Sequence, residues 1–110
     1  MMAAERNDPA RERVRLRSHV QQLREQLPRE LFDMTRWVLW KYETRGGKAT
    51  KVPWTVDGRR RAHADKPETW GDWIDAAAYC ESEAAILSGV AGIGFMLGEG
   101  IVGIDRKSVV

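Results

Sequence analysis

The segment that most restricts the fold is residues 36–43, RWVLWKYE, because it is apolar on both sides of an extended chain. Side chains alternate between the two faces of a β-strand. One face would carry Trp37 and Leu39, and the other Val38, Trp40 and Tyr42. A strand this rich in aromatic and β-branched residues is typical of the interior of a sheet. The chain therefore needs partner strands beside it and packing layers over it.

Three further segments are predicted to join this strand in one sheet. Residues 50–56, TKVPWTV, follow a glycine-rich turn signal. Within them Pro53 has no N–H for a ladder, which places the segment at an edge or at a bulge. Residues 92–97 and 101–105 are short apolar segments around the turn GEG, and they are predicted to form a hairpin.

Two helices are predicted to pack on the sheet. Residues 9–27 carry one apolar stripe with spacings of four, three and four, made of Leu16, Val20, Leu23 and Leu27. A second helix is predicted from Thr69, as its cap, to about residue 85. Its sheet-facing side would carry Trp70, Trp73, Ile74, Ala77 and Ala78. The order of elements predicts an α+β fold, with a small mixed or antiparallel sheet packed against helices.

Length and composition favour one small cytoplasmic domain. The chain has 110 residues, a single cysteine, Cys80, and no apolar run long enough to span a membrane. The first residues lack the apolar segment of a secretory signal. The net charge of +2 is only weakly basic, but arginines gather in residues 11–17 and again at Arg59, Arg60 and Arg61. The first group is typical of a solvated helix face, whereas the second is a candidate for phosphate contact.

Few residues indicate catalysis by themselves. Cys80 and the two histidines lack the spacing of zinc ligands, and the glycines near residue 95 do not form a phosphate-binding loop. The five tryptophans favour core packing at positions 37, 70 and 73, while Trp40 and Trp54 could instead stack on bases. His63 is predicted to be a surface residue and not a catalyst. Asp105 ends an apolar segment, which fits either an exposed turn or a metal ligand.

Several motifs in order resemble one family. RWVLWKYE, GGKATKVPW, DGRRRAHADKPETWGDW, GIGFML and GIVGID are similar to the start of the bifunctional primase–polymerase domain of phage and plasmid replication proteins, in the archaeo-eukaryotic primase superfamily. The resemblance covers about residues 34–105. It implies a partial primase–polymerase palm over residues 31–105, preceded in residues 1–30 by a disordered start and an added amphipathic helix. Deleting residues 1–30 would then leave the sheet folded.

The family implies a metal-dependent nucleotidyltransferase. In its palm, an Asp-x-Asp pair and a later acid bind Mg²⁺ or Mn²⁺, which position a nucleoside triphosphate for phosphoryl transfer on a DNA template. Asp105 matches the first acid and inherits the catalytic, metal-binding role. Lys51 and the three arginines Arg59, Arg60 and Arg61 would lie near phosphates or template. A helicase domain fused in the parent protein is a further expected partner.

The resemblance fails after Asp105. The family places a second acid where Lys107 stands, and a lysine cannot replace a carboxylate ligand. The opening of a widely used short-read sequencing adapter translates as DRKSVV followed by a stop. Residues 106–110 are therefore expected to be a non-native tail, and the adapter would then also encode Asp105. The expected product is an inactive fragment of a primase–polymerase. The alternatives are a nucleic-acid-binding accessory module without catalysis and a protein-interaction domain.

Overall fold

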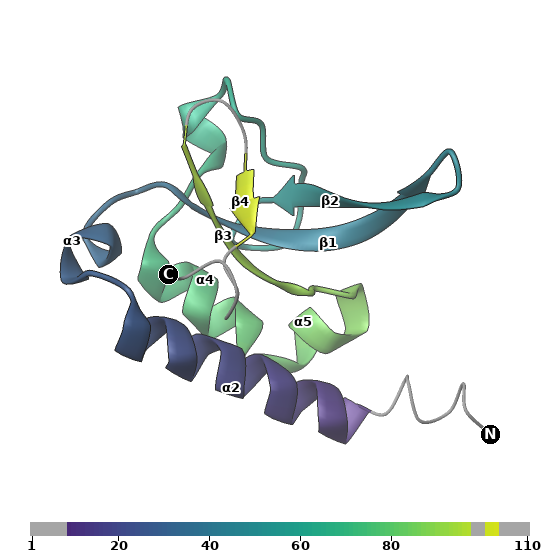
Figure 1. Cartoon of the computed structure of the whole chain (residues 1–110), viewed down its shortest axis with the longest axis horizontal. Coiled ribbons are helices and arrows are strands. Elements are labelled where there is room, and N and C mark those ends of the chain that lie inside the picture. The colour runs from purple at the N-terminus through teal and green to yellow at the C-terminus, as the bar shows by residue number, and fades with distance from the viewer. Residues whose placement is uncertain (1–8, 98–100, 104–110) are drawn as a thin grey trace.

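The computed structural model describes residues 9–97 and 101–103. In chain order the elements are α2 (Pro9–Gln26), α3 (Arg29–Phe32), β1 (Trp37–Arg45), β2 (Lys48–Trp54), the short 3₁₀ helix η1 (Pro67–Thr69), α4 (Trp73–Cys80), α5 (Glu83–Ser88), β3 (Gly92–Met96) and β4 (Ile101–Gly103). Helices α2, α4 and α5 lie together beside a single sheet (Figure 1). The predicted α+β class is confirmed.

The sheet has the strand order β2-β1-β3-β4, and every pairing is antiparallel. Strand β1 lies between β2 and β3, which confirms that RWVLWKYE is an interior strand. Strand β2 lies at an edge of the described sheet, as Pro53 requires. The hairpin of β3 and β4 is also confirmed over the residues that the structure describes, whereas residues 104 and 105 lie outside them.

The hairpin of β1 and β2 extends beyond the helical layer (Figure 1). Its register runs from Leu39 opposite Trp54 to Arg45 opposite Lys48, so only two residues form the turn. These are Gly46 and Gly47, with φ of 57° and 83°. A two-residue turn with both residues in the left-handed region matches the twist of the strands, and glycine enters that region without steric cost.

One core joins the helices to the sheet. Leu16, Val20 and Leu23 of α2 are at most 1% exposed and belong to the same buried cluster as Trp37 and Leu39 of β1. The apolar stripe predicted for the first helix is thus confirmed. Leu27 is partly buried against the same cluster. The domain boundary expected between residues 30 and 31 stays a prediction. In the structure, however, the helix before it and the sheet after it pack in one core.

The single helix predicted over residues 69–85 is wrong. The chain forms η1, an extended link, α4 and α5 instead. Gly71 exchanges two backbone hydrogen bonds with Trp37, at 2.9 and 2.8 Å, so the link must stay extended and the helix begins only at Trp73. The buried side of α4 therefore differs from the predicted one and consists of Trp73, Ala76, Ala77 and Cys80. Ile74, predicted to face the sheet, is 76% exposed, and Ala78 is exposed as well.

The other face of the sheet is covered at one end by the loop between β2 and α4. A second buried cluster there consists of Val38, Ala62 and Met96, with Trp70 packed against it. Trp70 and Trp73 therefore pack in different clusters, although the sequence prediction put them on one helix face. The backbone N–H of Ala62 donates to Pro53 O at 3.0 Å, which holds this loop against the edge strand β2.

Candidate nucleic-acid interface

The predicted site residues fall into two groups. Asp105 lies outside the described residues. Lys51 lies on β2, and Arg59, Arg60 and Arg61, here called the arginine loop, follow that strand. Residue 61 forms an isolated antiparallel bridge with Trp54, so the arginine loop runs back along the end of β2. All four predicted phosphate contacts thus belong to the edge strand β2 or to the loop beside it.

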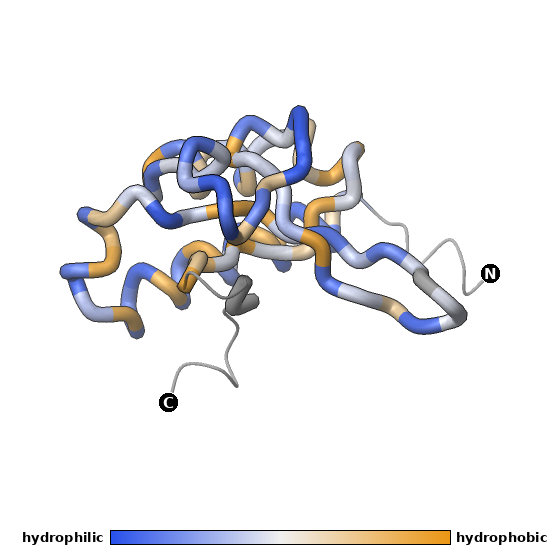
Figure 2. The backbone as a smooth tube through the Cα atoms, turned by 90° about the horizontal axis from the view of Figure 1, so that it is seen from above, coloured by the Kyte–Doolittle hydropathy of each residue, from blue (hydrophilic) through white to orange (hydrophobic). Residues whose placement is uncertain are grey.

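Positive charge is concentrated in this part of the chain. Residues 41–61 contain seven lysines and arginines and two acidic residues, which gives a net charge of +5. The other residues of the chain then carry a net charge of −3, because the whole chain carries +2. Figure 2 shows hydrophilic residues along the projecting hairpin, away from the apolar segments of the core. The small net charge therefore conceals a strongly basic region in residues 41–61.

The arginine loop is held by hydrogen bonds around Asp57. Its Oδ1 accepts from Thr55 Oγ1 at 2.6 Å and from the Arg59 backbone N–H at 3.0 Å. The Thr55 backbone N–H donates to Arg60 O at 2.8 Å. The Thr55 hydroxyl, followed by the Arg59 N–H and the nearby arginine charges, lowers the pKa of Asp57. Its carboxylate orders the loop that carries Arg59 and Arg60, both of which are exposed.

Trp54 lies between cations on the face that also packs against the helices. Lys41 Nζ stands 3.9 Å from the centroid of its ring, and the Arg61 guanidinium 6.0 Å. Arg61 also forms an ion pair of 2.9 Å with Glu43. Burial, opposed by Glu43, lowers the pKa of Lys41. Because Glu43 offsets the charge of both cations, this face is less suited to a base or phosphate.

The opposite face of the hairpin carries Trp40, Tyr42 and Lys51. Trp40 is only 5% exposed and its indole N–H donates to Ile93 O at 3.2 Å, so it is a core residue. A Cβ on Gly92 would approach the Trp40 ring to 2.9 Å, which explains the glycine at that position. Tyr42, in contrast, is 57% exposed. Of the two tryptophans left open by the sequence, neither is an exposed ring, whereas Tyr42 is exposed.

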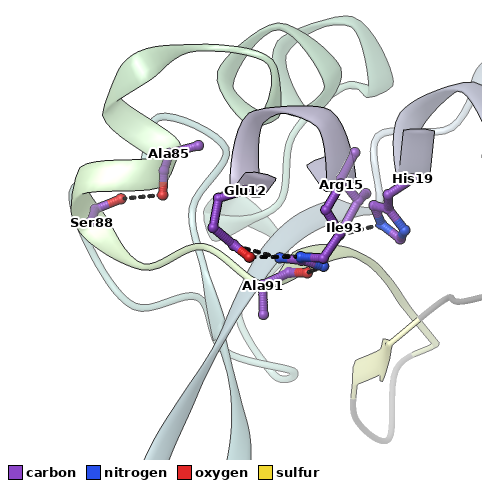
Figure 3. A network of polar contacts seen from close by, with 7 residues as sticks. All are labelled: Glu12, Arg15, His19, Ala85, Ser88, Ala91 and Ile93. Atoms are coloured by element: carbon purple, nitrogen blue, oxygen red, sulfur yellow. Dashed lines mark hydrogen bonds and ion pairs between the residues drawn. The ribbon is translucent and has the colours of Figure 1, made fainter. Parts of the chain in front are cut away.

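The sequence prediction also missed His19. Its Nε2 accepts the backbone N–H of Ile93 at 3.0 Å, near the start of β3 (Figure 3). Arg15 donates to Ala91 O at 3.2 Å and pairs with Glu12 at 3.0 Å. His19 lies three residues after Leu16 and four before Leu23, on the border of the apolar stripe, and that position was the available signal. His19 thus binds a backbone N–H of strand β3 and ties α2 to the sheet.

Other residues offer little for catalysis. Burial raises the pKa of the Cys80 thiol to about 12, which makes it a poor nucleophile. His63 is exposed, as predicted for a surface residue. Residues 9–97 and 101–103 contain no group of three or more His, Cys, Asp or Glu that could hold a metal ion. A cleft of about 560 Å³ lies between the arginine loop and α4, and its lining includes Asp57, Arg60, Trp70 and Tyr79.

Comparisons with models of known protein families, with curated proteins and with solved structures find no match to this chain. Among the described helices, none is both long and apolar enough to cross a membrane. The functional argument therefore depends on the charge, exposure and position of the residues around the β1–β2 hairpin.

Proposed function

We propose that the chain is the nucleic-acid-binding N-terminal part of a primase–polymerase, a metal-dependent nucleotidyltransferase of mobile-element replication. The observation that carries the binding role is the net charge of +5 within residues 41–61, on the hairpin that projects from the core and on the arginine loop beside it. The order of motifs supports the family assignment. A template DNA and nucleoside triphosphates are the partners of the complete protein.

Phosphate contacts explain why such a region suits DNA. Each cation that neutralises a phosphate releases condensed counterions, so affinity falls steeply as salt rises. The arginine loop is ordered by Asp57, which limits the conformational freedom that binding would otherwise remove. Binding of this kind depends little on base sequence, as a template-directed enzyme requires.

The catalytic role is assigned to a longer protein. Two-metal phosphoryl transfer needs several converging carboxylates. Asp105, the first of them by resemblance, lies outside the described residues, and the described ones hold no group of three ligands. No catalytic step is therefore derived for this chain. Mg²⁺ or Mn²⁺ would serve the complete domain, in which further acids join Asp105.

The binding role is tested with two matched double variants. Arg59→Ala/Arg60→Ala removes two exposed cations of the arginine loop and spares the ion pair of Arg61 with Glu43. Arg17→Ala/Arg29→Ala makes the same change of charge on α2 and α3, outside the basic region. Fluorescence anisotropy with labelled single-stranded DNA should show that the first variant lowers the salt slope of log K by about 1.4. The control should change it little, and equal slopes for the two variants would refute the role.

The enzymatic role is tested on the uninterrupted native gene product. Primer extension with magnesium or manganese is expected from that protein and not from the 110-residue chain. Asp105→Ala in the longer protein should abolish extension, provided that its native gene encodes that aspartate. If the longer protein binds DNA but never extends a primer, the chain belongs to an accessory binding module.

A further inference from the structure

The two faces of the β1–β2 hairpin offer different chemistry to a nucleic acid. Even-numbered residues of β1 lie on the face of the sheet opposite the main core, since Val38 joins the second cluster while Trp37 and Leu39 join the main one. Near the start of β3 this face borders α2, because Trp40 and Tyr42 line one cavity with Glu12 and Arg15. Tyr42 shares the face of Val38 and stands directly opposite Lys51 of β2. This face therefore presents an aromatic ring and a cation side by side, from adjacent strands.

The Tyr42 ring is supported on one side and open on the other. Towards the core it meets Trp40 edge-on, with ring centroids 5.0 Å apart and an angle of 85° between the planes. Towards the tip of the hairpin, the neighbours on the same face are Thr44 and Ala49, which are small. Tyr42 is consequently 57% exposed, although it belongs to a paired strand. Trp40 fixes the ring, and nothing bulky covers it from the tip.

A cation lies within reach of the same surface. Lys51 Nζ is 4.5 Å from the centroid of the Trp40 ring, so the ammonium is held over the aromatic neighbour of Tyr42. A base stacked on an aromatic side chain brings its own phosphate groups close to that ring. From this position on the Trp40 ring, the ammonium can also contact such a phosphate. No acidic residue of β1 or β2 shares this face, because Glu43 points to the opposite one. Glu12 of α2 lines a cavity with Tyr42, but its carboxylate is paired with Arg15 at 3.0 Å.

We infer that Tyr42 and Lys51 form a stacking site selective for single-stranded nucleic acid, in which an unpaired base lies on the Tyr42 ring and Lys51 contacts its phosphate. The inference rests on the proposed function and goes further, because it assigns strand selectivity to one residue pair. A base inside a duplex is already stacked on both sides, so only an unpaired base has a face to offer. The arginine loop contacts phosphates of either form.

The test compares a thymidine oligonucleotide with a duplex of equal length in anisotropy titrations. Tyr42→Leu keeps a large apolar side chain on an exposed strand position and removes the ring. It should weaken single-strand binding roughly 5- to 100-fold, leaving the duplex affinity and the salt slope unchanged. Tyr42→Phe should retain most of the affinity, since stacking does not need the hydroxyl. Lys51→Gln should lower the single-strand salt slope by about 0.7.

Thr44→Ala, on the same face but without a ring, is the matched control and should change neither affinity. Equal weakening of single-strand and duplex binding by Tyr42→Leu would overturn the inference, and so would no weakening. In both cases the proposed function survives if the wild-type chain binds and the arginine-loop variant lowers the slope. If the wild-type chain binds neither oligonucleotide, both proposals fail.

Discussion

Replacing Leu16 by alanine tests whether the first helix is part of the folding core. Leu16 is 1% exposed and packs in the cluster that contains Trp37 and Ile93. A Leu→Ala change at such a site loses transfer free energy and leaves a cavity, which together cost about 2–5 kcal/mol. A small domain has about 5–15 kcal/mol of unfolding free energy in total. The variant should therefore remain folded but lose a large share of its stability.

Urea unfolding followed by tryptophan fluorescence measures this loss directly. Trp37 and Trp73 are 0% and 7% exposed, so their emission should shift when the shared core opens. Val14→Ala is the control, because Val14 is on the same helix but 65% exposed, and its change should stay within about 0.5 kcal/mol. A loss below about 1 kcal/mol for Leu16→Ala would refute the argument that α2 is integral to the core.

The same reasoning reverses one expectation from the sequence. If α2 were an addition to a domain that starts near residue 34, deleting residues 1–30 would leave the sheet folded. That deletion removes Leu16, Val20 and Leu23, each at most 1% exposed. It also uncovers the apolar surfaces of α4, α5 and β3 that α2 contacts. The stabilising free energy lost with these three side chains and the uncovered surfaces approaches the whole unfolding free energy of a small domain. We therefore expect the shortened chain to lose cooperative unfolding.

Three further predictions concern single residues. His19→Ala should cost about 1–3 kcal/mol in urea unfolding, since it leaves the buried Ile93 N–H without its acceptor, whereas His19→Gln should retain much of that energy. Cys80 should resist thiol reagents in the folded chain; because its folded pKa of about 12 exceeds the unfolded value, stability should fall between about pH 9 and pH 12. Cys80→Ala should remove that part of the pH dependence. Ile74→Lys should leave the urea midpoint nearly unchanged, because Ile74 is 76% exposed, and a large loss would show that its face packs against something.

The sequence predicted strands better than it predicted the second helix. Continuous runs of apolar side chains located β1 and β3, and Pro53 placed β2 at an edge, because these signals depend on local chemistry. The helix failed because a tertiary contact decided it: the backbone pairing of Gly71 with Trp37 keeps residues 70–72 extended. Periodicity within residues 69–85 carries no information about a strand more than thirty residues earlier.

The candidate site was predictable in charge but not in geometry. Three consecutive arginines, together with Lys51 on a predicted edge strand, indicated a basic region. In the structure Lys51 lies on β2, and the arginines lie in the loop beside it. Which aromatic residue is open to solvent could not be predicted. Trp40 and Tyr42 share one face, and only their packing makes one a core residue and the other a surface residue. The exposure of Tyr42 depends on the small size of its neighbours Thr44 and Ala49.

The distribution of charge also bears on how a nucleic acid would approach. With +5 in residues 41–61 and −3 in the others, the chain is electrostatically polar even though its net charge is small. A polyanion is attracted to the projecting hairpin and the arginine loop and repelled by the acidic residues that follow residue 61, so the charges orient it before any close contact forms. The side chains that attract it lie mostly outside the apolar core, which α2, α4, α5 and the base of the sheet stabilise. Replacing cations on the hairpin should therefore change the affinity for nucleic acid with little effect on stability. Replacing core residues should mainly lower the free energy of unfolding. This separation makes the arginine-loop and Tyr42 variants informative, because a loss of affinity in them reports on the interface and not on a damaged fold.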